Sequence, residues 1–166
     1  MVDVQAVSVV IAAASVVAAA AGSIMQSRKA ERMRKTELFM QLFSPFSDPV
    51  LVSNWNEIVH HWKWTDYDDY WKKYGQKETE APKFVATASF FNGLGLLVKM
   101  GLLDVDTVRK WSPEACLWFW EKMEPIVREG RERLKAKGRA EHKIWGNVEY
   151  LYNELQKREQ TLQTQP

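Results

Sequence analysis

The sequence predicts an all-α protein in which one N-terminal transmembrane helix continues into a small cytosolic bundle of about five to six helices. Apolar residues recur at helical spacing along the chain, and no stretch alternates as a strand would. Residues 4–25 carry no charge. At about 1.5 Å per residue, a helix of this length covers the roughly 30 Å hydrocarbon core of a bilayer, so residues 1–26 are predicted to be a membrane anchor.

The predicted anchor is only weakly hydrophobic, since it consists mostly of Ala and Val and has no Leu or Phe. A cleaved signal peptide and a buried soluble helix are the alternatives. A signal peptide begins with positive charge, whereas only Asp3 precedes this run. The composition therefore favours a retained anchor, although the Ala-rich helix could instead pack within an assembly.

Basic residues follow the anchor and predict its orientation. Lys and Arg near a span favour the cytoplasmic side, so we expect the N-terminus outside and the C-terminal domain in the cytoplasm. The same cations would lie at the headgroups of an anionic leaflet. These predicted membrane-surface residues are Arg28, Lys29, Arg32, Arg34 and Lys35. A juxtamembrane helix is expected over residues 27–43, ended by Ser44 and Pro45.

Small residues form a seam on one face of the predicted anchor: Ser8, Ala12, Ser15, Ala19 and Gly22. Transmembrane helices pair through such faces because their backbones can approach closely. A segment this rich in Ala contains some small-residue seam by composition alone. Homo-oligomer formation is therefore one possibility that the sequence leaves open.

The remainder is predicted to form a bundle domain over residues 44–155 and a frayed polar tail over residues 156–166. None of the eight Trp, seven Phe and five Tyr lies in the predicted anchor, and the domain, which contains all the Trp and Tyr, can bury much apolar area. A net charge of +2 gives no strong nucleic-acid signature. The single cysteine, Cys116, excludes an intrachain disulfide and fits a reducing compartment; its aromatic neighbours predict a buried, inert thiol.

Capping signals and apolar periodicity predict where each helix of the bundle lies. Asp48, Asp66 (or Thr65), Asp104 and Ser112 are the expected N-caps, and Gly101 is an expected C-cap. The expected helices cover residues 49–62, 66–74, 84–100, 105–111, 113–134 and 144–155, with a polar loop over 76–82. Gly93 and Gly95 predict a close helix crossing, and Pro125 predicts a kink or a boundary near residues 121–124.

One set of segments is distinctive: residues 90–98, 101–104 and 118–121, then Pro125, Ile126 and Arg131, and finally residues 149–151. Together these segments resemble a prokaryotic family known as a domain of unknown function. The resemblance covers nearly the whole chain, from the anchor to about Leu155. The resemblance implies an N-terminal membrane helix joined to a small helical domain, and it implies no nucleophile, metal set or activity.

The sequence predicts no catalytic residue, cofactor or metal site. Glu57 and His60 share a helix face at the spacing of carboxylate-bridged metal bundles, but those bundles need two such motifs and this chain has one. Asp66, Asp68 and Asp69 lack the glycine and the distal Glu of a calcium loop, so they are expected to cap a helix. An enzyme is therefore not favoured.

A second basic stretch covers residues 128–143. Its candidate contact residues for phosphate, anionic lipid or nucleic acid are Arg128, Arg131, Lys135 and Arg139, which can share one helix face. Glu129 with Arg133 is expected to form an ordinary i, i+4 pair. A solvated helix surface is the favoured interpretation, and nucleic acid is an unlikely partner.

The favoured function is a noncatalytic, membrane-anchored protein-interaction module whose partner is unknown. The alternative is a membrane-tethered enzyme or small-ligand sensor. Its pocket would lie among Trp55, His60, Trp64, Tyr67, Asp68 and Trp71.

Overall fold

A computed structural model describes residues 48–138 and 144–163, together with scattered positions between Ser23 and Ser44. The chain divides into two compact units, Met1–Pro45 and Phe46–Pro166. The described residues contain helices and no strand, which confirms the predicted all-α class. In the first unit, the described positions from Ser23 to Gln41 are helical and exposed. The predicted anchor before Ser23 and the small-residue seam lie outside the described residues.

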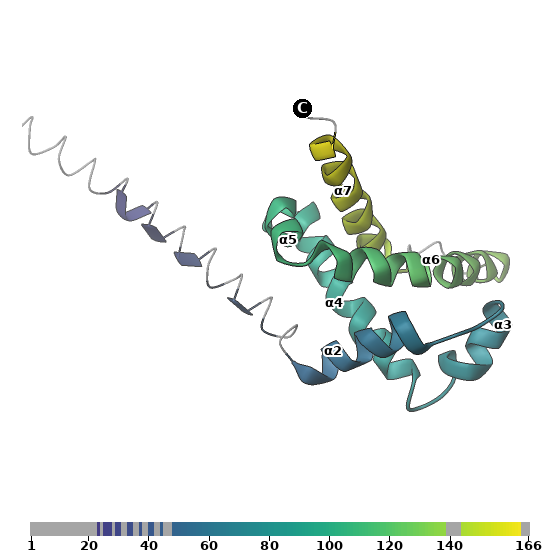
Figure 1. The fold of residues 1–166 in the computed structure, drawn as a ribbon. Coiled ribbons are helices and arrows are strands. Elements are labelled where there is room, and N and C mark those ends of the chain that lie inside the picture. The colour runs from purple at the N-terminus through teal and green to yellow at the C-terminus, as the bar shows by residue number, and fades with distance from the viewer. Residues whose placement is uncertain are drawn as a thin grey trace, which may run out of the picture. The chain divides into compact units, whose positions relative to one another are not determined.

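Three of the predicted N-caps are confirmed by hydrogen bonds. A carboxylate oxygen of Asp48 accepts from the Val50 N–H at 2.9 Å, and Asp104 accepts from the Asp106 N–H at 2.9 Å. Asp66, rather than Thr65, accepts from the Asp69 N–H at 2.8 Å. The helices of the second unit are α2 (Pro49–Asn56), α3 (Tyr67–Tyr70), α4 (Ala81–Lys99), α5 (Val105–Trp111), α6 (Pro113–Ala136) and α7 (Gly146–Gln163), as labelled in Figure 1.

Two of these helices end in π-helical turns. Helix α2 continues into η2 (Glu57–His61), and α3 continues into η3 (Trp71–Gly75). Each π-helical turn is closed by a hydrogen bond between residues i and i+5, so it contains one more residue than an α-helical turn. The side chains that follow therefore point in a different direction. After η2, the buried Trp62 stacks on Tyr74 with ring centroids 4.2 Å apart. The two turns thus hold the α2 and α3 segments together through aromatic contacts.

Helices α4 and α7 make the most extensive helix–helix contact of the second unit. Gly95 explains how closely they approach, because a side-chain carbon there would overlap the Asn147 backbone and lie 3.2 Å from the Cβ of Leu151. The side-chain oxygen of Asn92 accepts a hydrogen bond from the Asn147 N–H at 3.3 Å. Gly93 has open space around it. The predicted close crossing is therefore confirmed at Gly95 and wrong at Gly93.

The C-terminus of α4 confirms Gly101 as its C-cap. Gly101 has a positive φ of 69° and donates its N–H to the Val98 carbonyl at 3.0 Å. The Leu102 N–H donates to the Leu97 carbonyl at 3.0 Å. These two bonds form a Schellman motif, in which glycine takes the left-handed conformation at no steric cost.

Three predicted boundaries are wrong. Helix α4 starts at Ala81 rather than Phe84, because Pro82 fits the first helical turn, where its missing N–H has no partner to lose. Helix α6 passes through Pro125 without ending near residues 121–124; packing of Phe119, Trp120 and Met123 on one side and Ile126 and Val127 on the other holds the helix together. Helix α7 begins at Gly146, after Ile144, and continues to Gln163.

Helix α7 differs from the prediction at both of its ends. Ile144 was predicted to share an apolar stripe with Val148, Leu151 and Leu155. The latter three have no exposed surface, whereas Ile144 lies before the helix and is partly exposed. The fraying predicted after Leu155 does not begin there, since residues 156–163 extend the helix that the buried stripe stabilises.

The core of the second unit is rich in aromatic side chains. Trp62, Phe91, Phe119 and Trp120 are each almost fully buried. Phe91 and Phe119 stack at 5.2 Å between centroids, which joins α4 to α6. Cys116 is buried, as predicted, and burial raises the pKa of its thiol because the thiolate would lose its hydration.

Among the residues that the structure describes, α4 is the one helix long and apolar enough to cross a membrane, judged by length and composition alone. It packs against α7 and α2, and its residues Phe91 and Leu94 belong to the core. This finding leaves the N-terminal anchor a prediction.

Candidate functional site

The candidate site is a pocket of about 560 Å³ enclosed by α3, η3, the first turns of α4 and the C-terminal half of α6. Ile144 and Trp145, which precede α7, complete its wall. Figure 1 shows α3 beside the C-terminal half of α6, and these two elements are in contact. A concave apolar space of this size is typical of a binding site for a small molecule or for a side chain of a partner.

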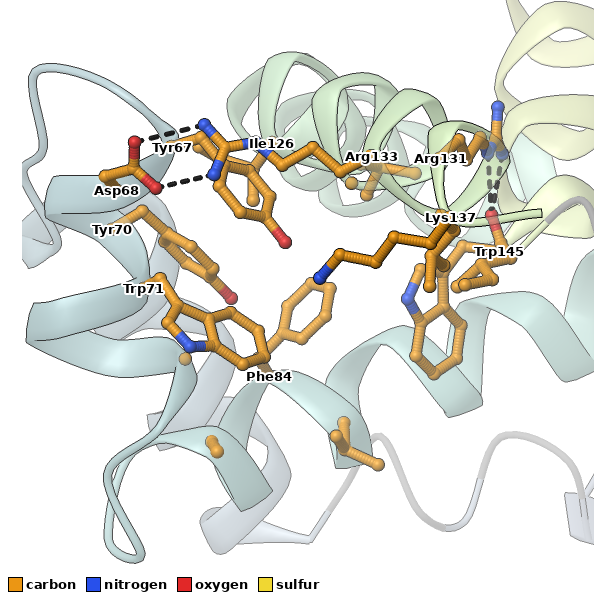
Figure 2. A pocket seen from close by; sticks show the side chains of 17 residues that line it. Tyr67, Asp68, Tyr70, Trp71, Phe84, Ile126, Arg131, Arg133, Lys137 and Trp145 are labelled. Atoms are coloured by element: carbon orange, nitrogen blue, oxygen red, sulfur yellow. Dashed lines mark hydrogen bonds and ion pairs between the residues drawn. The ribbon is translucent and has the colours of Figure 1, made fainter. Parts of the chain in front are cut away.

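Aromatic rings form the walls of the pocket. Tyr67 and Trp71 stack with centroids 6.2 Å apart and planes 7° apart. Phe84 meets Trp145 edge to face at 5.7 Å. Figure 2 shows Phe84 between Trp71 and Trp145, so rings from three separate segments face one interior. Gly130 of α6 leaves room beside them, because a side-chain carbon there would lie 3.4 Å from the Tyr67 ring.

Asp68 and Arg133 form an ion pair at the edge of the pocket (Figure 2). Arg133 donates to both carboxylate oxygens of Asp68, at 2.6 Å and 3.1 Å. It also donates to Glu129 at 2.8 Å, which confirms the predicted i, i+4 pair, and its guanidinium lies 4.3 Å from the centre of the Tyr67 ring. The hydrogen bond from Arg133 lowers the pKa of Asp68. Arg133 is thus neutralised by two carboxylates.

Arg131 connects α6 to the segment that begins α7. Its guanidinium donates to the Ile144 carbonyl at 2.7 Å and 3.0 Å, and to Glu149 at 2.7 Å. Its side chain is 20% exposed, so these bonds are partly shielded from water. Arg131 therefore holds the Ile144–Trp145 wall of the pocket in place.

Three polar groups point into the pocket without a partner among the described residues. They are the hydroxyls of Tyr67 and Tyr70 and the ammonium of Lys137, which are directed toward the same part of the interior in Figure 2. Tyr70 is only 3% exposed, and burial raises the pKa of its phenol, so the group stays protonated. Lys137 follows the last residue of α6 and extends across the opening.

The structure brings together three of the six residues of the pocket predicted from the sequence. Tyr67, Asp68 and Trp71 line the observed pocket, as the sequence analysis proposed. The other three predicted residues lie elsewhere: Trp55 and His60 form a separate cluster with Trp118, and the Trp64 ring lies 4.6 Å from the Lys122 ammonium.

Phe84, Trp145 and Lys137 line the pocket but were missed by sequence reasoning. Phe84 is distant in sequence from Lys137 and Trp145, and no spacing rule connects the three. A cation following helix α6 was the only local signal, and it had been included in the basic stretch over residues 128–143.

The basic residues predicted to contact phosphate or lipid are largely engaged within the chain. Arg128 pairs with Glu124 at 2.6 Å, and Arg131 with Glu149 at 2.7 Å. Lys135 also has an interaction within the chain, and Arg139 lies outside the described residues. In the membrane-proximal cluster, Lys29 and Arg34 are exposed, whereas Arg28, Arg32 and Lys35 are outside the described residues.

A search for groups of three or more metal-ligating side chains finds none among the described residues. Glu57, which was considered as a ligand beside His60, accepts instead from Lys83 at 2.8 Å and 2.9 Å and from the Trp62 indole at 3.3 Å. The Lys83 hydrogen bond is the main reason that the pKa of Glu57 is lowered. Glu57 therefore serves to join η2 to α4.

The site and the fold define an all-helical domain with an aromatic, half-open pocket. The chain belongs to the family described as Domain of unknown function (DUF4760), whose model matches residues 6–155. This match confirms the resemblance to a family of unknown function that rests on residues 90–98, 101–104 and 118–121, on Pro125, Ile126 and Arg131, and on residues 149–151. Neither the comparison with curated proteins nor that with solved structures gave a match.

Proposed function

We propose that the protein is a membrane-anchored, noncatalytic interaction module that binds a protein partner through the aromatic pocket. The observation that carries this proposal is a group of exposed apolar side chains around the opening. Trp71 is 48% exposed, Val85 is 50% exposed and Ile144 is 38% exposed, and all three line the pocket.

Such an arrangement suits the docking of an apolar side chain. Interface energy concentrates in a few well-packed anchor residues, and Trp and Tyr are enriched among these anchors. The exposed rims of Trp71 and Val85 would be removed from water when a partner covers the opening, at about 25 cal/mol per Å² of apolar surface. The interior rings would supply a shaped, preformed receptor, so little ordering is needed on binding.

The anchor in residues 1–26 completes the proposal. A span oriented with its N-terminus outside would place the bundle in the cytoplasm, near the leaflet contacted by the basic cluster after residue 27. Confinement to a membrane raises the local concentration of the pocket for a partner in or near the same membrane. Reporter fusions test the orientation: a C-terminal alkaline phosphatase fusion is expected to be inactive, and a C-terminal fluorescent fusion active; the opposite pattern would contradict the proposal.

The binding proposal is tested by crosslinking the full-length protein in native membranes and identifying what copurifies. The matched variants are Trp71→Ala, at the pocket, and Trp118→Ala, which removes an equally large ring that is 46% exposed and lies outside the pocket. We expect one partner to be lost in Trp71→Ala and kept in Trp118→Ala. Equal recovery from both variants would rule out the pocket as the docking site.

A small-ligand sensor is the second candidate, because the pocket volume of about 560 Å³ lies within the range of drug-sized sites. Ligand binding to the native state must raise its stability. A metabolite that stabilises the wild type, but not Trp71→Ala, in a thermal-shift screen would favour this second candidate over a protein partner.

A further inference from the structure

The Tyr70 hydroxyl faces the pocket and has no hydrogen-bond partner within the part of the chain that the structure describes. Only 3% of the Tyr70 surface is exposed, so the pocket is the space from which a partner can reach this hydroxyl. Because Tyr70 lines the pocket, a group bound there could accept its hydrogen bond.

Two further donors lie on the same side of the pocket. The Tyr67 hydroxyl and the Lys137 ammonium point toward the region that the Tyr70 hydroxyl faces (Figure 2). Neither makes a side-chain hydrogen bond or ion pair with a described residue. The carbonyls at the end of α6 offer Lys137 only partial negative charge.

The remaining cations of the pocket are already paired. Arg133 is held by Asp68 and Glu129, and Arg131 by Glu149 and the Ile144 carbonyl. One full positive charge, that of Lys137, is therefore left for a ligand. Two phenol donors and one ammonium suit an acceptor with a single negative charge, whereas a phosphate group is usually bound by several free cations or backbone donors.

From this geometry we infer that the pocket binds an aromatic or aliphatic body bearing one carboxylate. The carboxylate accepts hydrogen bonds from Tyr70 and Tyr67 and pairs with Lys137. The apolar body lies among Trp71, Phe84 and Trp145. The inference rests on the proposed function, since it assigns the chemistry of the group that the pocket receives.

The test measures binding of 3-phenylpropionate to the full-length protein in lipid nanodiscs by isothermal titration calorimetry, with empty nanodiscs as background. Its neutral partner, 3-phenylpropionamide, has the same shape without the charge. We expect the carboxylate to bind about tenfold more tightly than the amide, because hydrogen bonds to a charged group are the stronger ones. Equal affinity of the acid and its amide would overturn the inference.

Variants then locate the recognition. Lys137→Gln should weaken carboxylate binding about tenfold and leave amide binding nearly unchanged, because the amide carries no charge. Tyr70→Phe, which removes only the hydroxyl, should weaken carboxylate binding several-fold. The matched controls are Lys110→Gln, an exposed lysine of α5, and Tyr150→Phe of α7, neither of which lines the pocket. Carboxylate binding that is unchanged in Lys137→Gln and Tyr70→Phe would contradict the assignment.

A second arm identifies the source of the carboxylate. It uses a hexapeptide ending in Phe with a free C-terminus and the same peptide with a C-terminal amide. Tighter binding of the free-acid peptide than of 3-phenylpropionate would indicate a protein segment, and binding of 3-phenylpropionate alone would indicate a free small acid. If neither acid binds but the Trp71-dependent crosslink persists, the carboxylate assignment fails while the proposed interaction stands.

Discussion

Two helical glycines mark the contrast between the most closely packed region of the domain and its open one. Gly95 lies where the start of α7 presses against α4, and no side chain fits between them. Gly130 lies on the pocket wall, where a side-chain carbon would make ordinary contact with the Tyr67 ring at 3.4 Å. Glycine thus allows two helices to touch at position 95 and keeps space open in the pocket at position 130.

The contrast separates what holds the fold from what is available for binding. The α4–α7 crossing buries Val148, Leu151 and Leu155 completely. The pocket instead keeps large apolar side chains exposed, and their burial would contribute stability only when a ligand or partner covers them. Substitutions at the α4–α7 crossing and at the pocket should therefore change the free energy of unfolding by different amounts and in opposite directions.

The largest effect is expected from Gly95→Ala. The new methyl group would overlap the Asn147 backbone, so α7 must shift away from α4. Overpacking of this kind should lower the free energy of unfolding by about 3 kcal/mol, measured by urea denaturation of the full-length protein. Gly93→Ala is the matched control; its methyl group meets open space and should raise stability by roughly 0.5 to 1 kcal/mol through helix propensity. An unchanged unfolding midpoint for Gly95→Ala would contradict the close crossing.

Arg131→Leu should have the next largest effect. It removes the cation that joins α6 to Glu149 and to the Ile144 carbonyl, and it leaves both acceptors unpaired in a partly buried setting. We expect a loss of about 2 kcal/mol in the free energy of unfolding. Arg128→Leu breaks only an exposed pair with Glu124 and should cost less than about 0.5 kcal/mol. Similar losses in the two variants would mean that the Arg131 bonds do not stabilise the pocket wall.

Gly130→Ala should act in the opposite direction to Gly95→Ala. Alanine favours the helical conformation and its methyl group has room beside Tyr67, so the free energy of unfolding should rise by roughly 0.5 to 1 kcal/mol. The same methyl group narrows the pocket, and partner crosslinking should weaken. A destabilised Gly130→Ala would show that the pocket wall is as closely packed as the α4–α7 crossing.

The smallest effect concerns acid stability at Glu57. Hydrogen bonding from Lys83 lowers the pKa of Glu57 below its ordinary value of 4.5, so the folded state binds fewer protons than the unfolded state. Its stabilising contribution is present above pH 4.5 and is lost as the pH falls through the lower folded pKa. Glu57→Gln should therefore show a shallower decline of the unfolding free energy in this acidic range. An identical decline in both proteins would contradict the role of this pair.

Local rules predicted the elements of the fold well. Asp48, Asp66 and Asp104 cap helices because a side chain and the N–H groups it accepts from lie within a few residues. Of the two outcomes predicted near Pro125, a kink or a boundary, the boundary is wrong because packing on both sides of the proline outweighs one lost backbone bond. Ile144 fitted the stripe of the last helix by spacing, yet Arg131 holds its carbonyl outside that helix.

The pocket could be predicted only in part. Tyr67, Asp68 and Trp71 are neighbours in sequence, so a local aromatic cluster indicated them. Phe84 and Lys137 join them only through the packing of α3 on α6 and α4, which no single-sequence spacing encodes. Likewise, the aromatic richness around Trp55 and His60 indicated a site that the structure places elsewhere.

Site-specific photocrosslinking from helix α4 tests the proposed docking site most directly. Val85 and Leu96 lie on this one helix and are similarly exposed, at 50% and 43%, but only Val85 lines the pocket. A photoreactive side chain is placed at either position in the full-length protein in native membranes, and adducts are identified by mass spectrometry. We expect one partner to be captured from position 85 and not from position 96; capture of the same partner equally from both positions, or only from position 96, would contradict the proposed docking site.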